Sequence, residues 1–298
     1  MWRTILILFF GLFIAFCRGA EVVKSEIQGQ SFIADYYCRQ DSTNMLGVLF
    51  LGGSEGGKPR GYFARFLATN GYPTLALAYF KEKGLPESLQ SIPLEYFDQA
   101  IAWMETNQQA HVDRVVVVGA SRGAELALLL ASTNPKIKGV VALSPSSVVW
   151  NGMPKELPIV PCSSWTLCGK PVPFLPYDST KAVPKDMHDI YLLFQEALKQ
   201  RKAVEKAAIK VERIHGPVLL ASGQDDEIWP AGEMADAICT RLEEKGFKYR
   251  FENLKYPDAG HTLNEGLMMG GTFEGNQKAR IDIDEQALVF LKAIEKTH

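Results

Sequence analysis

The sequence lacks an excess of charge of either sign. Its 298 residues include 32 Lys and Arg against 34 Asp and Glu, which gives a formal net charge of −2 at pH 7. This balance gives no indication of a nucleic-acid partner. The chain also lacks repeats and low-complexity tracts, and its 47% hydrophobic residues are enough for one large buried core. We therefore expect an ordinary globular protein that binds no nucleic acid.

Long apolar runs are also missing. The run at residues 5–16 is shorter than the roughly 20 residues that a transmembrane helix needs. It follows the positively charged start at Arg3 and precedes the small residues Gly19 and Ala20, as in a secretory signal peptide. We expect residues 1–20 to be cleaved, which predicts an exported protein, periplasmic or secreted, without stable membrane insertion. A buried N-terminal helix and an uncleaved anchor are the alternatives.

Cysteine is scarce, and one of the five, Cys17, falls in the predicted signal. In an oxidising compartment the other four can form disulfides. Cys162 and Cys168 lie in a Pro- and Gly-rich stretch that lacks metal-ligand spacing and His partners. We expect a disulfide between these two and no metal site. Cys38 and Cys239 fit either a long-range bridge or two free buried thiols.

Apolar runs alternate with amphipathic stretches along the chain. The expected strands are residues 46–51, 72–80, 115–118, 140–143, 217–220 and 249–254. The expected helices are residues 59–70, 94–107, a helix that ends at residue 131, residues 186–206 and residues 284–297. Strands that are apolar on both faces and separated by helices predict a mostly parallel sheet flanked by helices. Functional residues are then expected in loops at the carboxyl ends of the strands.

One long segment interrupts this alternation before the strand at 217–220. Its first part, residues 146–177, is loop-like and rich in proline, and a predicted helix follows. We interpret residues 146–206 as an insertion into a single catalytic domain, residues 21–298. Such an insertion either covers the functional site as a lid or is a passive surface excursion.

The pentapeptide Gly119-Ala120-Ser121-Arg122-Gly123 matches the G-x-S-x-G nucleophile elbow of the α/β-hydrolase fold. It lies between a predicted strand and a predicted helix, as this turn requires. The glycines allow a tight turn that lifts the serine hydroxyl above the sheet, and the helix N-terminus favours developing negative charge. We predict that Ser121 is the catalytic nucleophile. A small-residue turn that only packs helix against strand is the alternative.

A serine nucleophile needs a general base, and in this fold the acid and then the histidine follow the serine along the chain. His261 lies in a loop after the last predicted strand. Of the other candidates, His298 is the C-terminal residue, His188 lies in the insertion, and His215 precedes a strand on the wrong side of the sheet. We therefore expect His261 to be the general base.

The acid that orients this histidine is expected in the loop after residues 217–220. Asp226 lies three residues after a glycine and four before a proline, which is the usual pattern, and we predict it as the acid. Asp225 is the second choice and Glu227 the third. Asp258 is too close to the histidine in sequence to orient it.

An acyl-transfer site also needs backbone N–H groups that receive the oxyanion. One is expected from Arg122, the residue after the nucleophile. The other is expected from Gly53 or Ser54 in the glycine-rich loop at residues 52–57, where the backbone can approach the substrate closely. The loop lacks the lysine pattern of a phosphate-binding P-loop.

A basic stretch ends the insertion. It either meets the phosphates of a coenzyme A thioester or is a solvated helix face, and it comprises Lys199, Arg201, Lys202, Lys206 and Lys210.

Several longer stretches together resemble one family, the C-terminal catalytic domain of the acyl-CoA thioester hydrolases and bile acid-CoA:amino acid N-acyltransferases. The resemblance begins near residue 49 and extends to the C-terminus. Its most distinctive stretches are residues 74–80, 85–86, 92–97, 169–176, 222–226, 229–230 and 256–261. The family's catalytic triad corresponds to Ser121, Asp226 and His261.

The resemblance implies a hydrolase of acyl thioesters that needs no cofactor and acts on a small-molecule substrate. Amino-acid-transferring members have cysteine as nucleophile, so the serine in this chain indicates water as the acceptor. The N-terminal β-sandwich of multidomain members has no counterpart, and we expect the catalytic domain alone. Two alternatives are a carboxylesterase or dienelactone-hydrolase-like enzyme acting on small esters, and a catalytically silent binding protein.

Overall fold

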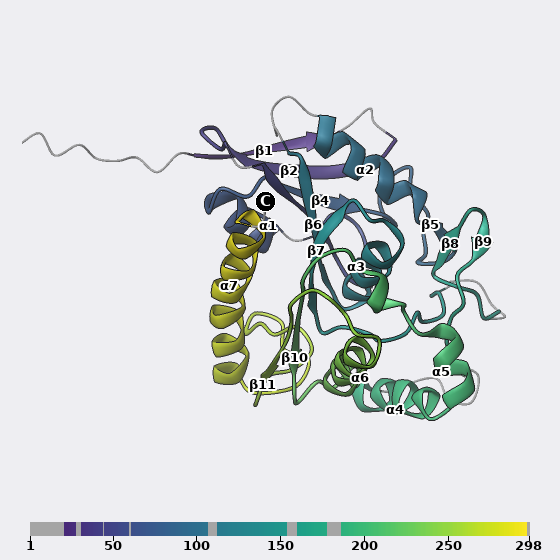
Figure 1. Cartoon of the computed structure of the whole chain (residues 1–298). Coiled ribbons are helices and arrows are strands. Elements are labelled where there is room, and N and C mark those ends of the chain that lie inside the picture. The colour runs from purple at the N-terminus through teal and green to yellow at the C-terminus, as the bar shows by residue number, and fades with distance from the viewer. Residues whose placement is uncertain are drawn as a thin grey trace, which may run out of the picture.

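The computed structural model describes residues 21–27, 31–43, 45–59, 61–106, 112–153, 160–177 and 186–296. A sheet of eight strands lies at the centre, with helices on both sides (Figure 1). The predicted signal peptide, residues 1–20, lies outside the described residues, so cleavage and export remain predictions from sequence. Among the described residues, no helix is long and apolar enough to span a membrane.

The strand order in the sheet is β1-β2-β4-β3-β6-β7-β10-β11. Six of these strands run parallel to one another: β3 (Leu46–Leu51), β4 (Thr74–Ala78), β6 (Arg114–Ala120), β7 (Ile137–Leu143), β10 (Val218–Gly223) and β11 (Phe251–Tyr256). Every residue of β3, β4 and β10 is buried, because helices cover both faces of the sheet. The predicted mostly parallel sheet is therefore confirmed.

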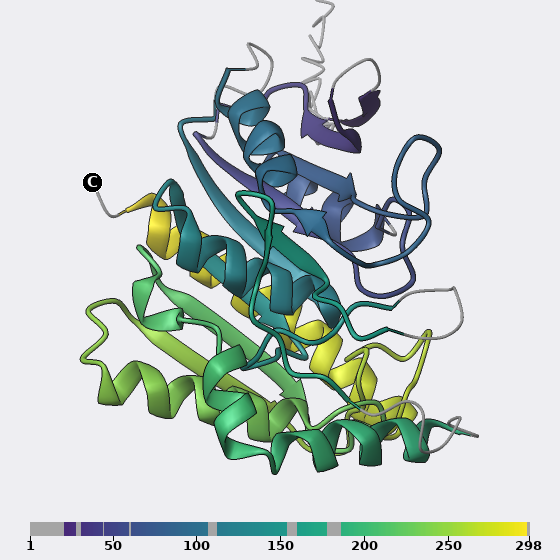
Figure 2. The same ribbon diagram turned by 90° about the vertical axis from the view of Figure 1, so that its right-hand side faces the viewer.

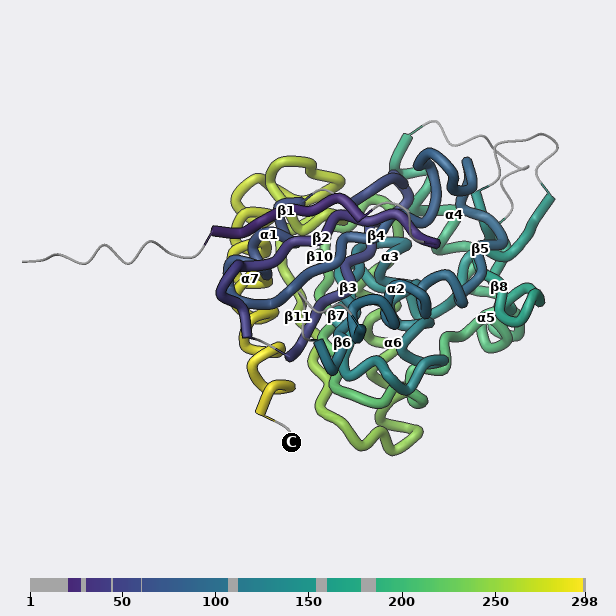
Figure 3. The backbone as a smooth tube through the Cα atoms, turned by 90° about the horizontal axis from the view of Figure 1, so that it is seen from above, coloured from purple at the N-terminus to yellow at the C-terminus, as the bar shows by residue number. Residues whose placement is uncertain are grey.

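The helices form two layers (Figure 3). On one face α1 (Gly61–Thr69) and α7 (Phe273–Glu295) bury their apolar sides in a core shared with β3 and β6. On the other face lie α2 (Glu95–Thr106), α3 (Arg122–Thr133) and α6 (Ala231–Glu244), which pack in the larger core. The strands β3, β6, β10 and β11 run in the same direction. The loops that follow them therefore leave the sheet at the same edge, where the predicted site residues lie.

The chain between β7 and β10 forms an insertion that shares a small core with α6. It contains β8 (Trp165–Leu167), β9 (Lys170–Pro171), α4 (Met187–Leu198), α5 (Arg201–Ala207) and the 3-10 helix η1 (Val211–Arg213). The strand β8 pairs with β5 (Ile92–Pro93) outside the main sheet. Both α4 and α5 lie beside α6 (Figure 2) and contribute to a cluster around Trp150 and Trp229.

The helix predicted at residues 186–206 is two helices. The chain turns at Lys199 and Gln200, so that Phe194 of α4 and Val204 of α5 both reach the same apolar cluster. One straight helix would carry these side chains past the two tryptophans. Packing has therefore overridden a continuous helical pattern that contains no proline or glycine.

Two further elements differ from the sequence prediction. The antiparallel strands β1 (Val22–Ile27) and β2 (Ile33–Arg39) at the sheet edge have no predicted counterpart, and the mixed burial of β1 explains its weak apolar signal. The last helix begins at Phe273 instead of residue 284. Its first turn contains Gly275, where a Cβ would lie 2.0 Å from the Asp258 carbonyl oxygen. That glycine serves close packing and does not end the helix.

The predicted disulfide between Cys162 and Cys168 is wrong, because both residues are free thiols in the structure. The strand β8 lies between them and extends by about 3.3 Å per residue, whereas a disulfide needs Cα atoms within roughly 7 Å. Cys162 is half-buried and faces Gln90, while Cys168 is exposed in the turn after β8. Cys38 and Cys239 are also free thiols, but they are half-buried, so the second of the two interpretations that the sequence left open holds for their redox state and not for full burial.

Candidate active site

Ser121 occupies a strained turn between β6 and α3. Its φ of 55° and ψ of −121° are unusual for a residue with a side chain. The backbones on either side are in close contact: a Cβ on Gly119 would lie 2.0 Å from the Gly123 carbonyl oxygen, and one on Gly123 would lie 2.3 Å from the Gly52 carbonyl oxygen. Only glycine fits at both positions. The turn therefore has the geometry expected of a nucleophile elbow.

Three predicted side chains meet at this turn. The Asp226 carboxylate accepts a hydrogen bond from His261 Nδ1, with 2.8 Å between Nδ1 and Oδ2. In that tautomer Nε2 of His261 is free to accept from the Ser121 hydroxyl, which lies 2.9 Å away. Asp226 and His261 are 8% and 7% exposed, so the chain of hydrogen bonds is largely shielded from water.

The structure also distinguishes Asp226 from its neighbours. The second carboxylate oxygen of Asp226 accepts from the backbone N–H groups of Ile228 at 2.8 Å and Trp229 at 3.1 Å. Asp225 and Glu227 are exposed, whereas Asp226 is buried. The sequence preference for Asp226 therefore agrees with the geometry. The excluded histidines, His188 and His215, and the excluded Asp258 are likewise exposed.

The loop that carries His261 is held by residues that sequence reasoning missed. Asn276 of α7 is fully buried, and its Oδ1 accepts from the Gly260 N–H at 3.1 Å. Its amide nitrogen donates to the carbonyls of Gly270 and Thr272. No motif contains Asn276, and its position in a helix gives no signal of this role.

Two more contacts fix the histidine itself. The Ser144 hydroxyl, directly after β7, donates to the His261 carbonyl at 2.5 Å. The Trp229 ring meets the imidazole edge to face, with ring centroids 5.5 Å apart. The place of Ser144 at the carboxyl end of a parallel strand is the one sequence signal that could have found it.

The predicted oxyanion donors lie beside the serine. The N–H of Arg122 has no acceptor among the described residues, as expected at the start of a helix. A Cβ on Gly53 would lie 3.2 Å from Ser121 Cβ, so the loop after β3 passes next to the nucleophile. The Gly53 N–H donates to the Glu55 carboxylate at 3.0 Å, whereas Ser54 is exposed.

A buried ion pair underlies the turn. Arg122 Nη1 lies 2.8 Å from Glu125 Oε2, within the first turn of α3. Burial raises the pKa of Glu125 to about 7, although Arg122 and the N–H groups of Trp165 and Trp150 oppose the shift. Desolvation of the carboxylate thus outweighs its favourable contacts.

The sequence model of the family described as BAAT / Acyl-CoA thioester hydrolase C terminal matches residues 92–292. The chain belongs to this family. It is 32% identical over 217 residues to acyl-coenzyme A thioesterase 2, mitochondrial, of Mus musculus, an alignment that covers 73% of the chain and 45% of that protein. Acyl-coenzyme A thioesterase 6 of Mus musculus is 29% identical over 263 residues, with 83% and 59% covered. The chain thus spans about half the length of these curated relatives.

Solved structures agree with this membership at the level of the fold. The Pyrococcus furiosus esterase Pf2001 superposes with a TM-score of 0.55 at 16% identity, covering 93% of the chain and 92% of the esterase. A mutant of the esterase rPPE gives a TM-score of 0.59 at 19% identity, with 94% and 85% covered. The family member described here therefore has the predicted α/β-hydrolase fold, and the family resemblance in the sequence is confirmed.

Other predicted site features stay outside this cluster. Of the predicted basic stretch, Lys199 follows α4 and forms an ion pair with Glu196 at 2.7 Å. Arg201, Lys202 and Lys206 are exposed on α5, and Lys210 after α5 is half-buried. Contact with a coenzyme A phosphate stays a hypothesis for this stretch. Within the described ranges, no group of three or more His, Cys, Asp or Glu side chains has a metal-binding arrangement.

Replacing Glu125 should change how stability depends on pH. The folded protein keeps a proton on Glu125 up to about pH 7, whereas the unfolded chain loses it near its ordinary pKa of 4.5. This group's contribution to stability is therefore complete below pH 4.5 and lost as the pH rises to 7. Relative to Glu125→Gln, the wild type should lose about 3 kcal/mol of unfolding free energy over that range. Urea unfolding across the range measures this, with the exposed Glu244→Gln as control; a pH-independent difference would contradict it.

Removal of the Asn276 amide should loosen the histidine loop. In Asn276→Ala the buried N–H of Gly260 loses its acceptor and the Gly270 carbonyl loses a donor, whereas the Thr272 carbonyl keeps the backbone N–H of residue 276. The unfolding free energy should therefore fall by about 1–3 kcal/mol. The matched control is Asn70→Ala, which removes an exposed amide that bonds only within its own helix end. Equal stability of the two variants in urea would show that Asn276 is not a structural support.

Proposed function

We propose that the chain is a serine hydrolase that cleaves acyl thioesters, of the acyl-CoA type, through an acyl-enzyme intermediate. The observation that carries this proposal is the continuous hydrogen-bonded series from Ser121 through His261 to Asp226, with distances of 2.9 and 2.8 Å. The relatives that bear the name acyl-coenzyme A thioesterase support the choice of thioester.

In the first half-reaction Ser121 Oγ attacks the acyl carbonyl while His261 Nε2 takes its proton. Asp226 stays ionised and stabilises the imidazolium that forms. The tetrahedral intermediate then collapses, its carbon–sulfur bond breaks, and the proton passes from His261 to the departing thiolate. Ser121 is left as an acyl ester.

The second half-reaction repeats these steps with water as nucleophile. His261 takes a proton from the water as its oxygen attacks the acyl ester, and returns that proton to Ser121 Oγ as the carboxylic acid leaves. In both halves the oxyanion is received by the N–H of Arg122 and by that of Gly53 or Ser54, of which we assign Gly53 because its loop passes next to Ser121. The N-terminal end of α3 adds its positive partial charge at the same place.

Hydrolysis of small oxygen esters is the second candidate, because the same groups act on either kind of carbonyl. The solved esterases with this fold favour it, but their identity to the chain is below 20% and speaks to the fold alone. A catalytically silent binding protein is the third possibility, and the hydrogen-bonded triad argues against it.

The decisive measurement compares turnover of a long-chain acyl-CoA and of a short p-nitrophenyl ester. We expect preference for the acyl-CoA and a loss of at least a thousandfold in kcat in Ser121→Ala. The matched control is Ser31→Ala, an exposed serine before β2, which should keep wild-type rates.

Each other outcome is informative. Turnover of the short ester alone would favour the esterase. Failure of Ser121 to react with a fluorophosphonate, together with no turnover, would support the silent binding protein. Equal turnover in Ser121→Ala would show that the nucleophile is assigned wrongly.

The contact between Glu55 and Gly53 yields a second prediction. In the free protein this carboxylate accepts from an N–H that the proposal assigns to the oxyanion, so substrate and Glu55 compete for it. Glu55→Ala should therefore raise kcat/KM by about two- to tenfold, because a charge-assisted hydrogen bond no longer has to be broken. Glu244→Ala, which removes a distant exposed carboxylate, is the control. A fall in kcat/KM would mean that Glu55 holds the loop in its active shape.

A further inference from the structure

Arg122 is a cation in an unfavourable place. It is the first residue of α3, where the helix N-terminus carries a positive partial charge, and its side chain is only 5% exposed. Both the helix dipole and desolvation disfavour a lone guanidinium there. The fully buried side chain of Glu125, one turn later, lies 2.8 Å away and compensates this charge when it is ionised.

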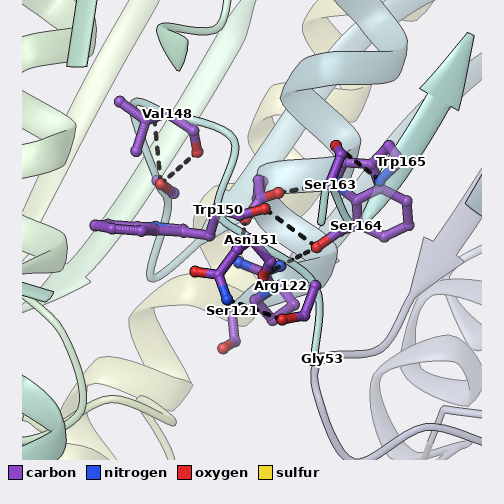
Figure 4. Close-up of polar contacts among 12 residues, drawn as sticks. Gly53, Ser121, Arg122, Val148, Trp150, Asn151, Ser163, Ser164 and Trp165 are labelled. Carbon is purple, nitrogen blue, oxygen red and sulfur yellow. Dashed lines mark hydrogen bonds and ion pairs between the residues drawn. The ribbon is translucent and has the colours of Figure 1, made fainter. Parts of the chain in front are cut away.

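The remaining guanidinium contacts leave the helix. Arg122 Nη2 donates to the Asn151 carbonyl at 2.9 Å and also to the Ser164 hydroxyl. Figure 4 shows the Arg122 side chain next to these two residues, with Ser121 on the adjacent turn. Asn151 and Ser164 belong to two separate segments of the insertion, so one side chain joins both to the nucleophile turn.

Glu125 makes a matching connection. Its Oε1 accepts from the indole N–H of Trp165 at 2.7 Å, and Trp165 is the first residue of β8. The insertion is itself anchored here, because the Ser164 carbonyl accepts from the N–H of Ile92 at 2.8 Å. The ion pair thus ties the first turn of α3 to a small sheet outside the helix.

We propose that Arg122 and Glu125 are a positioning pair that holds the backbone N–H of Arg122 where the oxyanion forms. This inference rests on the proposed function. A preorganised donor stabilises a developing charge only at hydrogen-bonding distance, and a misplacement of about 1 Å is enough to cost a large factor in rate. The Arg122 side chain is held by Glu125 within the helix and by Asn151 and Ser164 in the insertion. The backbone N–H of the same residue is therefore fixed from both the helix and the insertion.

A purely structural role makes a different prediction. Well-packed apolar residues often replace a buried ion pair with no loss of stability. The double variant R122M/E125L should therefore fold, and if the pair serves stability alone it should also keep its activity. As a positioning pair it should instead lower kcat by about tenfold or more while KM for the same ester or thioester stays within about threefold.

The experiment measures kcat, KM and the midpoint of thermal unfolding for R122M/E125L, for Arg122→Lys and for the wild type. Arg122→Lys keeps the positive charge but lacks the planar guanidinium that contacts Glu125, Asn151 and Ser164 at once. Its kcat should lie between that of the wild type and that of the double variant. The matched control is R241M/E212L, which removes a bidentate ion pair between α6 and η1 with two 2.6 Å contacts and should leave kcat unchanged.

A folded R122M/E125L protein with wild-type kcat would overturn the inference. Should that variant fail to fold, Ser164→Ala decides the question, because it removes one anchor of Arg122 and leaves the ion pair intact. A drop of about two- to fivefold in its kcat at unchanged KM supports the inference, and an unchanged kcat overturns it. Wild-type protein without Ser121-dependent turnover would overturn the proposed function itself, and the role of the pair with it.

Discussion

The carbonyl oxygens of Gly52 and Gly123 approach the turn at Ser121 so closely that no Cβ fits at Gly119 or Gly123. Strand β6 and helix α3 therefore meet with a single residue between them, and that residue takes a backbone conformation that costs about 1–3 kcal/mol. Such strain persists only where the surroundings enforce it. Here the backbone contacts at Gly119 and Gly123 enforce the conformation. They place the Ser121 side chain and the N-terminus of α3 on the same side of the turn, where the substrate carbonyl is expected.

The parallel sheet brings the other groups to that point. Asp226 follows β10 and His261 follows β11, and these two strands pair in parallel register from Val218 to Gly223. Their following loops consequently begin at the same edge as the turn after β6. Ser121 and His261 are 140 residues apart in sequence. Because the sheet already brings their loops to one edge, only the loop lengths have to suit the 2.9 Å contact between Ser121 Oγ and His261 Nε2.

The meeting of Ser121, His261 and Asp226 could be predicted because these residues fall in an order and in motifs that the chain itself displays. Ser121 lies in a pentapeptide with a strand before it, and Asp226 was favoured over Asp225 by its spacing from a glycine and a proline. The supports could not be predicted in this way. Asn276 holds the histidine loop from the first turn of a helix, and Ser144 contacts it from the position directly after β7.

Local patterns also misled where tertiary packing decides the outcome. The spacing of Cys162 and Cys168 suggested a closed loop, but β8 pairs with β5 and keeps that stretch extended. The pattern over residues 186–206 suggested one helix, but two are needed to surround Trp150 and Trp229. The sequence prediction also missed the first eleven residues of α7, whose first turn contains Gly275. The close packing of this glycine against Asp258 has no signature in the sequence.

The insertion is connected to the proposed catalytic series at two places. Through Asn151, Ser164 and Trp165 it is hydrogen-bonded to the buried pair beneath Ser121, and these contacts are shielded from water. Through α4 it packs Phe194 on Trp229, with ring centroids 5.6 Å apart, and Trp229 in turn meets His261. An insertion that swung away as one body would have to expose the Arg122 guanidinium and its partners, which burial makes costly. These hydrogen bonds therefore fix the part around β8 to the turn at Ser121, whereas α4 meets the site through the apolar packing of Phe194 on Trp229.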